Sequence, residues 1–377
     1  MARTPPPTAV APSAAGRPGR RYRVGVTTTE RELTGPVDLC LPDGRLDPAA
    51  VGWSRRPLHR ANLRGWGRTK RWEYWCVTGP THIVAVTVSD LDFLGLTGLY
   101  VLRHGEPGRA PVDLERTALL PFGHGVRLPE TIAGAAGAGD DVVVGPERPV
   151  RGQVRVEIRA EGTGTRLRAR CLTPDHRPVE LDVLVGLPPG HETLGVVVPW
   201  SGRRFQYTSK HTARPASGSL RIGDERYPFG DDAWGVLDHG RGRWPRNAAW
   251  NWGAASGRTD GRVVGLQFGG RWTAGTGATE NALCVDGRLS KIGEELLWLY
   301  DEADPMAPWE LRTPSSDQVD LVFTPFHDRR TRTEAGLLAN RTDQCFGRYS
   351  GQIRTDDGEH VRIDGLLGWA EDVRMRW

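Results

Sequence analysis

Hydrophobic and polar residues alternate along much of the chain, and this period of two is the pattern of half-buried β-strands. In Gln153–Arg159, apolar residues occupy every second position and charged or polar residues stand between them. The alternation returns at 167–171 and at 179–185, and segments containing Gly or Asp separate the three runs. Runs of this kind, broken by turn residues, predict an antiparallel meander.

The clearest predicted hairpin runs from Ile353 to Ile363, with Asp357-Gly358 at its turn, because Asp-Gly suits a two-residue turn. Helical patterns are scarce. Residues 292–300 fit either two helical turns or a buried strand, and the Ala- and Gly-rich residues 129–139 fit a loop or a weak helix. The 48 glycines and 28 prolines leave little room for long helices. The sequence therefore predicts an all-β fold of closed antiparallel sheets with few helices.

Length and cysteine content limit the class of protein. A chain of 377 residues has room for two or three domains, and it buries enough surface to fold without disulfides. Its five cysteines are scattered and form no C-x-x-C pair, so neither a zinc site nor a disulfide framework is expected. Residues 1–21 are rich in Pro and Ala and are predicted to be a disordered leader, not a signal peptide. We expect a cytoplasmic protein.

The charge pattern argues against a nucleic-acid partner, and the hydropathy pattern argues against a membrane span. The 50 basic and 46 acidic residues nearly balance, and only three of the basic residues are lysines. This arginine bias is typical of GC-rich bacterial coding of the actinobacterial kind. The arginines are interleaved with acids, so no nucleic-acid partner is predicted. No apolar run approaches the ~20 residues that a membrane span needs. The sequence predicts no particular oligomeric state.

Two aromatic-rich segments, 66–75 and 234–252, hold the residues best suited to chemistry. The second contains four tryptophans, three arginines and the dipeptide Asp238-His239. In an apolar cavity, burial would favour the neutral form of Asp238, and a neutral carboxylic acid can donate a proton to a double bond or a carbonyl. Trp250 and Trp252 are two positions apart, so both rings would face one side and stabilise developing positive charge.

Structural roles compete with this hypothesis. Asp238 would instead pair with Arg241 or Arg243, or lie in a turn. In a regular strand His239 faces away from Asp238, so a structural hydrogen bond is its expected role. Lys210 would bind a carboxylate or phosphate group, or lie exposed in a loop.

Glu73 would be a second acid or the partner of an arginine. No nucleophile elbow, phosphate loop, metal-binding spacing or dinucleotide motif is present, so no cofactor or metal is expected. The candidate catalytic residues are Asp238 and His239, and the candidate ligand-binding residues are Trp72, Glu73, Trp75, Lys210, Arg241, Trp244, Trp250 and Trp252.

Several long motifs carry a resemblance to a bacterial family known as domain of unknown function 2804. They are Glu32–Trp75, Thr208–His211, Leu237–Pro245 and Gly365–Trp377. More distantly, Arg71–Trp75 and Ala233–Trp252 are similar to segments of the carotenoid hydratase / AttH lipocalin-like group. That resemblance implies two lipocalin-like antiparallel β-barrels packed side by side, which we place at 22–204 and 205–377. The chain departs from the group's pattern because three residues, not one, separate Trp234 from Asp238.

Three functions fit these observations. The first is cofactor-free hydration, isomerisation or cyclisation of an apolar molecule (isoprenoid, lipid or polyketide-like) in a barrel cavity, with Asp238 as the acid. The second is a carrier that binds such a molecule without converting it, since the same pocket serves both. The third is a carbohydrate-active protein, which would need two converging carboxylates.

Overall fold

The computed structural model describes residues 28–105, 108, 110–134, 140–336 and 338–377. In these residues the strands form two large sheets, of 13 and 9 strands, and a parallel pair of β1 (Val37–Asp38) with β3 (His59–Arg60). One short 3-10 turn, η1 (Pro48–Ala50), is the only helical element of the described chain. The predicted all-β fold is confirmed. The predicted leader, 1–21, lies outside the described residues.

The first sheet is antiparallel throughout. Its main path is, in spatial order, β7 (Val112–Pro121), β6 (Leu94–Arg103), β5 (His82–Asp90), β4 (Thr69–Thr78), β15 (Trp234–Arg243), β13 (Arg204–Ile222), β11 (Pro178–Val185), β10 (Gly164–Leu172), β9 (Arg155–Glu161) and β8 (Val142–Val144). Three further strands complete it: β12 (Leu194–Ser201) and β14 (Glu225–Phe229) pair with β13, and β2 (Trp53–Ser54) pairs with β12.

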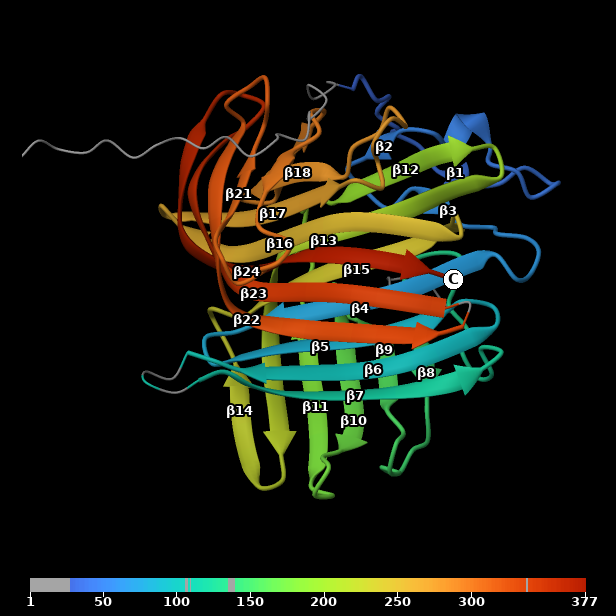
Figure 1. Cartoon of the computed structure of the whole chain (residues 1–377), viewed down its shortest axis with the longest axis vertical. Coiled ribbons are helices and arrows are strands. Elements are labelled where there is room, and N and C mark those ends of the chain that lie inside the picture. Colours follow the sequence, from blue (N-terminus) through green and yellow to red (C-terminus); the bar gives the residue numbers. More distant parts are fainter. Residues whose placement is uncertain (1–27, 106–107, 109, 135–139, 337) are drawn as a thin grey trace, which may run out of the picture.

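The strands of the first sheet change direction along β13. Its first half lies between β12 and β15, and its second half lies between β11 and β14. The register with β15 shifts between His211 and Arg214, where Ala213 has φ 55°. A bulge of this kind bends a strand and increases its twist. In Figure 1, β10, β11 and β14 accordingly cross the direction of β4–β7.

The second sheet is also antiparallel and is built from the C-terminal part of the chain. Its spatial order is β19 (Arg288–Ile292), β18 (Asn281–Val285), β17 (Arg262–Gly270), β16 (Asn247–Thr259), β24 (His360–Arg376), β23 (Leu338–Arg354), β22 (Val319–Ala335), β21 (Trp309–Arg312) and β20 (Leu297–Leu299). In Figure 1, β22–β24 curve away from β16–β18 at one end of the molecule.

The local predictions agree well with these elements. The meander expected from Gln153 onward is β9, β10 and β11, and the hairpin around Asp357-Gly358 joins β23 to β24, with Ile353 paired to Val361. Of the two options for 292–300, the helix is wrong, because this stretch holds the end of β19 and all of β20. No helix in the described residues has the length and apolarity to cross a membrane.

Several apolar clusters hold the sheets together, and three of them locate the cores. One core lies inside the curl of the first sheet and includes Trp75 and Leu237. A second lies inside the second sheet. A third layer joins the sheets: Cys76 and Val236 of the first pack with Trp252 and neighbouring aromatics of the second. The face of β4, β15 and β13 that points away from the first core is therefore buried against the second sheet.

The chain passes from the first sheet to the second between β15 and β16, at residues 244–246. The domain limit predicted at 204/205 falls at the start of β13, whose neighbour β12 belongs to the same sheet. The division of the chain into domains remains a prediction.

Candidate functional site

Side-chain alternation on β4, β15 and β13 sorts the predicted site residues onto two faces. Asp238 lies opposite Tyr74 on one neighbouring strand and Lys210 on the other, on the face toward the second sheet. His239 lies opposite Glu73 and points into the first sheet. Asp238 and His239 thus lie on opposite faces, as the strand pattern predicts.

The face toward the second sheet carries one buried ammonium group with carboxyl partners. Lys210 Nζ is 2.9 Å from Asp238 Oδ1 and 3.2 Å from Glu280 Oε1. It also lies 4.3 Å from the centroid of the Trp252 ring. Burial alone would lower the pKa of Lys210, but the two carboxyl groups raise it above its ordinary value. Lys210 is therefore a buried cation, and the alternative of an exposed loop lysine is wrong.

Two glutamates, Glu280 immediately before β18 and Glu371 on β24, complete what we call the acid cluster: Lys210, Asp238, Glu280 and Glu371. Glu371 on β24 accepts a hydrogen bond from Trp250 Nε1 at 2.8 Å. Burial raises the pKa of Glu371 to about 7, against the opposing effects of Trp250 and Lys210. Burial likewise raises the pKa of Glu280 to about 7. Near neutral pH, each glutamate is present in both protonated and ionised forms.

A group of indole rings, the tryptophan cluster, adjoins the acid cluster. The ring of Trp244 lies 4.9–5.8 Å from five others. Its members are Trp72, Trp200, Trp244, Trp250, Trp272 and Trp377. Trp244 and Trp272 are buried, whereas the other four are half-buried. The tryptophan cluster thus extends from the surface to Glu371, which Trp250 contacts directly.

Two glycines allow this packing. A methyl group on Gly240 would overlap the ring of Trp72, and one on Gly242 would overlap the carbonyl oxygen of Phe205. The glycines of the G-R-G segment on β15 therefore let an indole and the neighbouring strand lie close against the sheet. Gln206, held between them, accepts a hydrogen bond from Trp244 Nε1 at 2.7 Å.

The opposite face holds a second, fully buried group. Glu73 Oε1 accepts hydrogen bonds from His239 Nδ1 at 2.8 Å and from Arg241 Nη2 at 2.6 Å. Burial would raise the pKa of Glu73, but these two neighbours lower it below its ordinary value. Burial also lowers the pKa of His239. Glu73 is thus an arginine's partner, while Trp75 lies in the first core beneath Arg214, whose guanidinium is 5.0 Å from the ring.

The predicted site residues therefore separate into two groups. Asp238, Lys210, Trp250 and Trp252 meet around the acid cluster, with Trp72 and Trp244 in the adjoining tryptophan cluster, whereas Glu73, Trp75, His239 and Arg241 lie on the other face of the first sheet. Asp238 pairs with Lys210 in a strand, and not with either of the arginines expected for it.

Sequence reasoning missed Glu280, Glu371 and three members of the tryptophan cluster, Trp200, Trp272 and Trp377. A signal for the two acids exists in the chain. Glu280 stands in the otherwise uncharged stretch 272–285, and Glu371 follows the apolar run 365–370. An acid without a basic neighbour in an apolar strand must find its partner elsewhere in the fold or become protonated. Within the described ranges, no group of three or more His, Cys, Asp or Glu residues is arranged to hold a metal ion.

Comparisons with known proteins complete these observations. Kievitone hydratase from Nectria haematococca is a structural neighbour with a TM-score of 0.44 and 11% identity, covering 82% of this chain and 89% of its own. An AttH candidate from Nitrosomonas europaea has a TM-score of 0.41 and 13% identity, with 82% and 92% covered. CghA has a TM-score of 0.38 and 11% identity, with 82% and 88% covered. No curated protein matches the chain. The model of one family, Domain of unknown function (DUF2804), matches residues 30–377, and the chain therefore belongs to that family.

Proposed function

We propose that the acid cluster transfers protons to and from a small apolar molecule, without a cofactor, in a hydration, isomerisation or cyclisation reaction. The observation that carries the proposal is that three carboxyl groups gather beside the tryptophan cluster: the Lys210 ammonium contacts those of Asp238 and Glu280, and Trp250 donates to that of Glu371. Two of them, Glu280 and Glu371, have pKa values raised to about 7. A general acid or base works best when its pKa is near the working pH.

The chemistry follows from these protonation states. A neutral Glu371 can donate its proton to a double bond or a carbonyl of a molecule held among the indoles. The faces of Trp250 and Trp252 stabilise the positive charge that develops, by ~0.5–2 kcal/mol per ring. An ionised Glu280 or Asp238 then removes a proton from carbon or from an attacking water. The Lys210 ammonium contacts both carboxyl groups, and its charge opposes the effect of burial on the pKa of Glu280.

The half-buried tryptophans supply the route that we propose for a substrate. Trp72, Trp200, Trp250 and Trp377 are partly exposed, and Trp250 contacts Glu371, so a ligand would enter by displacing indole rings. Rings of this kind favour a flat or branched apolar molecule. A sugar hydrolase would need two carboxyl groups free to flank the glycosidic bond, whereas Lys210 contacts both Asp238 and Glu280.

The test compares the wild type with Glu371→Gln, produced in a bacterial host with GC-rich coding. Small molecules that co-purify with each protein are extracted and identified by mass spectrometry. Asp372→Asn is the matched control, because Asp372 is the next residue along, is also buried and pairs with Arg271 outside the acid cluster. Any compound enriched in Glu371→Gln is then incubated with wild-type protein in D2O.

A compound that accumulates on Glu371→Gln, and that the wild type and Asp372→Asn convert with deuterium entering at carbon, supports proton-transfer catalysis. The same compound bound unchanged to all three proteins contradicts catalysis and identifies a carrier. Absence of any bound apolar compound contradicts the ligand class itself.

A further inference from the structure

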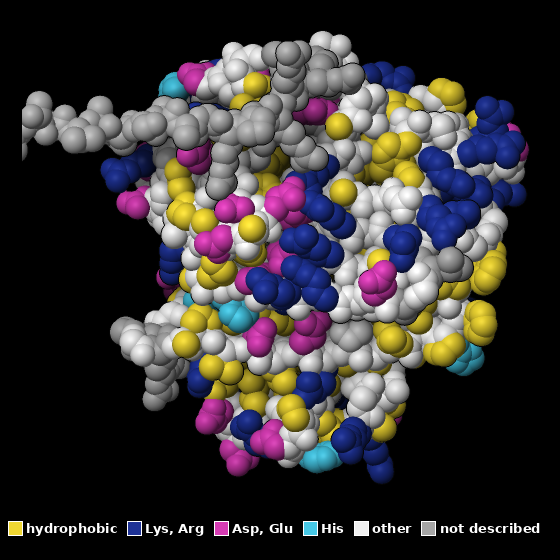
Figure 2. Space-filling model, in the orientation of Figure 1, with side chains coloured by type: hydrophobic (Ala, Val, Ile, Leu, Met, Phe, Trp, Pro, Cys, Tyr) yellow, Lys and Arg dark blue, Asp and Glu magenta, His cyan; other side chains and the backbone are white. Residues whose placement is uncertain are grey.

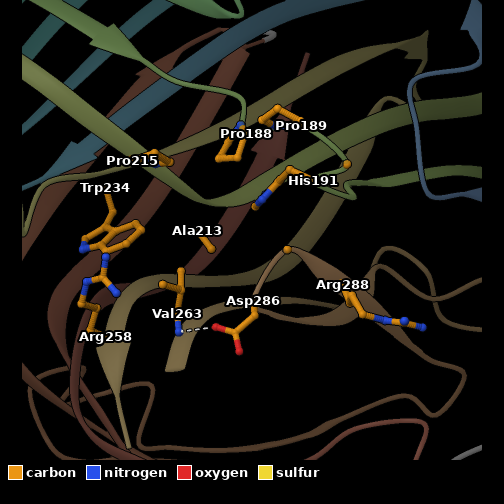
Figure 3. Close-up of a pocket in the computed structure, with 12 residues that line it drawn as sticks. Pro188, Pro189, His191, Ala213, Pro215, Trp234, Arg258, Val263, Asp286 and Arg288 are labelled. Atoms are coloured by element: carbon orange, nitrogen blue, oxygen red, sulfur yellow. Dashed lines mark hydrogen bonds between the residues drawn. The ribbon is translucent and has the colours of Figure 1, made fainter. Parts of the chain in front are cut away.

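A separate pocket of about 390 Å³ lies where β13 and β15 meet β16, β17 and the turn between β18 and β19. Figure 3 shows Pro188, Pro189 and Pro215 along one side of it and Trp234 with Arg258 at one end. Ala213 and Val263 line its centre. Its walls are thus mainly apolar, as small-molecule sites commonly are.

Arg258 is an exposed cation, and Asp286 of the pocket lining is close enough for the Arg258 charge to lower its pKa. Its guanidinium lies 5.5 Å from the centroid of the Trp234 ring, and among the described residues it has neither an ion pair nor a hydrogen bond. Stacking over an indole holds a guanidinium in place while its N–H groups stay free at the edge. Arg258 is therefore positioned to receive an anion at the end of the pocket.

The other polar groups of the pocket are already engaged or turned away. Asp286 pairs with Arg262 and accepts a hydrogen bond from the Val263 backbone N–H at 2.9 Å. His191 Nε2 is 2.9 Å from the Thr212 carbonyl oxygen, so that nitrogen donates. Burial lowers the pKa of His191, so the ring is neutral at pH 7.

Many arginines elsewhere on the surface are paired with acids. Figure 2 shows basic side chains gathered over β22–β24 with acidic ones beside them. There Arg332 is 2.5 Å from Asp343, and Arg374 is 2.5 Å from Glu302. Those arginines are neutralised by the protein itself. The remaining arginine of the pocket lining, Arg288, extends away from the other residues in Figure 3.

We propose that this pocket binds a small organic anion with an apolar body, whose carboxylate pairs with Arg258 while its hydrocarbon part lies against the prolines, Val263 and Trp234. This site is distinct from the acid cluster. Trp234 and Asp238 lie on the same strand four residues apart, which corresponds to about 13 Å. The proposal therefore does not depend on the catalytic role assigned above.

The test is isothermal titration of the full chain with octanoate and with octan-1-ol, which share an apolar chain and differ in charge. A charge-assisted hydrogen bond contributes about 1.5–3 kcal/mol, so the wild type is expected to bind octanoate at least about tenfold more tightly. Arg258→Gln should remove that preference and leave octan-1-ol binding unchanged. Arg258→Lys should keep part of it, and Val263→Phe should weaken binding of both ligands by filling the pocket.

Two controls make the result specific. Arg203→Gln changes the net charge equally at an exposed position in the β12–β13 turn, and it should bind as the wild type does. Glu371→Gln should also bind octanoate normally, which separates this site from the acid cluster. Equal affinity of the wild type for both ligands, no binding of octanoate, or unchanged octanoate binding by a folded Arg258→Gln variant would each overturn the proposal.

Discussion

At the scale of single residues, burial decides the protonation of the acid cluster. The pKa of Glu371 is raised from 4.5 to about 7, chiefly by burial. Between these two pH values the folded protein holds a proton that the unfolded chain has released. Stability therefore falls as the pH rises through this window, and the loss is complete above pH 7.

Glu371→Gln should abolish this loss, because the amide is neutral and still accepts the hydrogen bond from Trp250. We expect the variant to match the wild type near pH 4.5 and to exceed its unfolding free energy by about 3 kcal/mol at pH 8. Urea unfolding between pH 4.5 and 8 measures this. A constant difference across that range would show that Glu371 ionises normally in the fold.

The buried Glu73 on the other face of the first sheet differs from Glu371, because the Arg241 guanidinium neutralises its charge. Arg241→Leu leaves the Glu73 carboxylate buried without its guanidinium and should destabilise the protein by about 3–5 kcal/mol. Glu73→Leu combined with Arg241→Leu should cost clearly less than the two single changes together. Guanidinium unfolding of the four proteins gives the coupling. Strict additivity would mean that Glu73 and Arg241 contribute independently.

The face of β15 on which each side chain lies could be predicted from the sequence, but the residues that it contacts could not. Alternation in a strand is enough to place Asp238 and His239 on opposite faces. The contact of Lys210 with Glu280, however, joins a strand of the first sheet to the residue that precedes β18 of the second. Such a contact depends on how the sheets pack, and no local pattern encodes it.

At the scale of elements, the short strands and hairpins could be predicted because turn chemistry is local. β9–β11 and the β23–β24 hairpin follow directly from alternation and Asp-Gly turns. The long strand β13 was harder to anticipate, since it changes partners halfway along. Its bulge at Ala213 has no glycine to mark it.

The glycines of β15 give a prediction at this scale. Gly242→Ala should destabilise the fold by about 1–3 kcal/mol, because the added methyl group meets the backbone of Phe205. Gly230→Ala is the matched control, because nothing lies within 4 Å of the added atom there. Thermal unfolding compares the two. Equal melting temperatures would show that β15 and β13 can move apart to accept the methyl group without a loss of stability.

At the scale of the whole molecule, the first sheet is complete only when β13 and β15 are present. A fragment of residues 22–204 lacks both strands, leaves β4 as an unpaired edge and removes Leu237 from the first core. We expect this fragment to aggregate, and a fragment of residues 22–246, which keeps the first core whole but exposes the face that packs on the second sheet, to be richer in β-structure. Circular dichroism and size-exclusion chromatography distinguish them. A folded 22–204 fragment would support the domain limit predicted from the sequence.

The pairing of β4 with β15 also has a consequence for the protein as it is being made. Thr78 and Trp234 are neighbours in the sheet but 156 residues apart in the chain. At a synthesis rate of ~5–20 residues per second, β4 leaves the ribosome about 8–30 seconds before its partner. Throughout that interval the β4–β7 meander exposes a hydrogen-bonding edge and one side of its core. We therefore expect nascent chains of this protein to bind chaperones, and slow codons between β7 and β13 to lengthen their exposure.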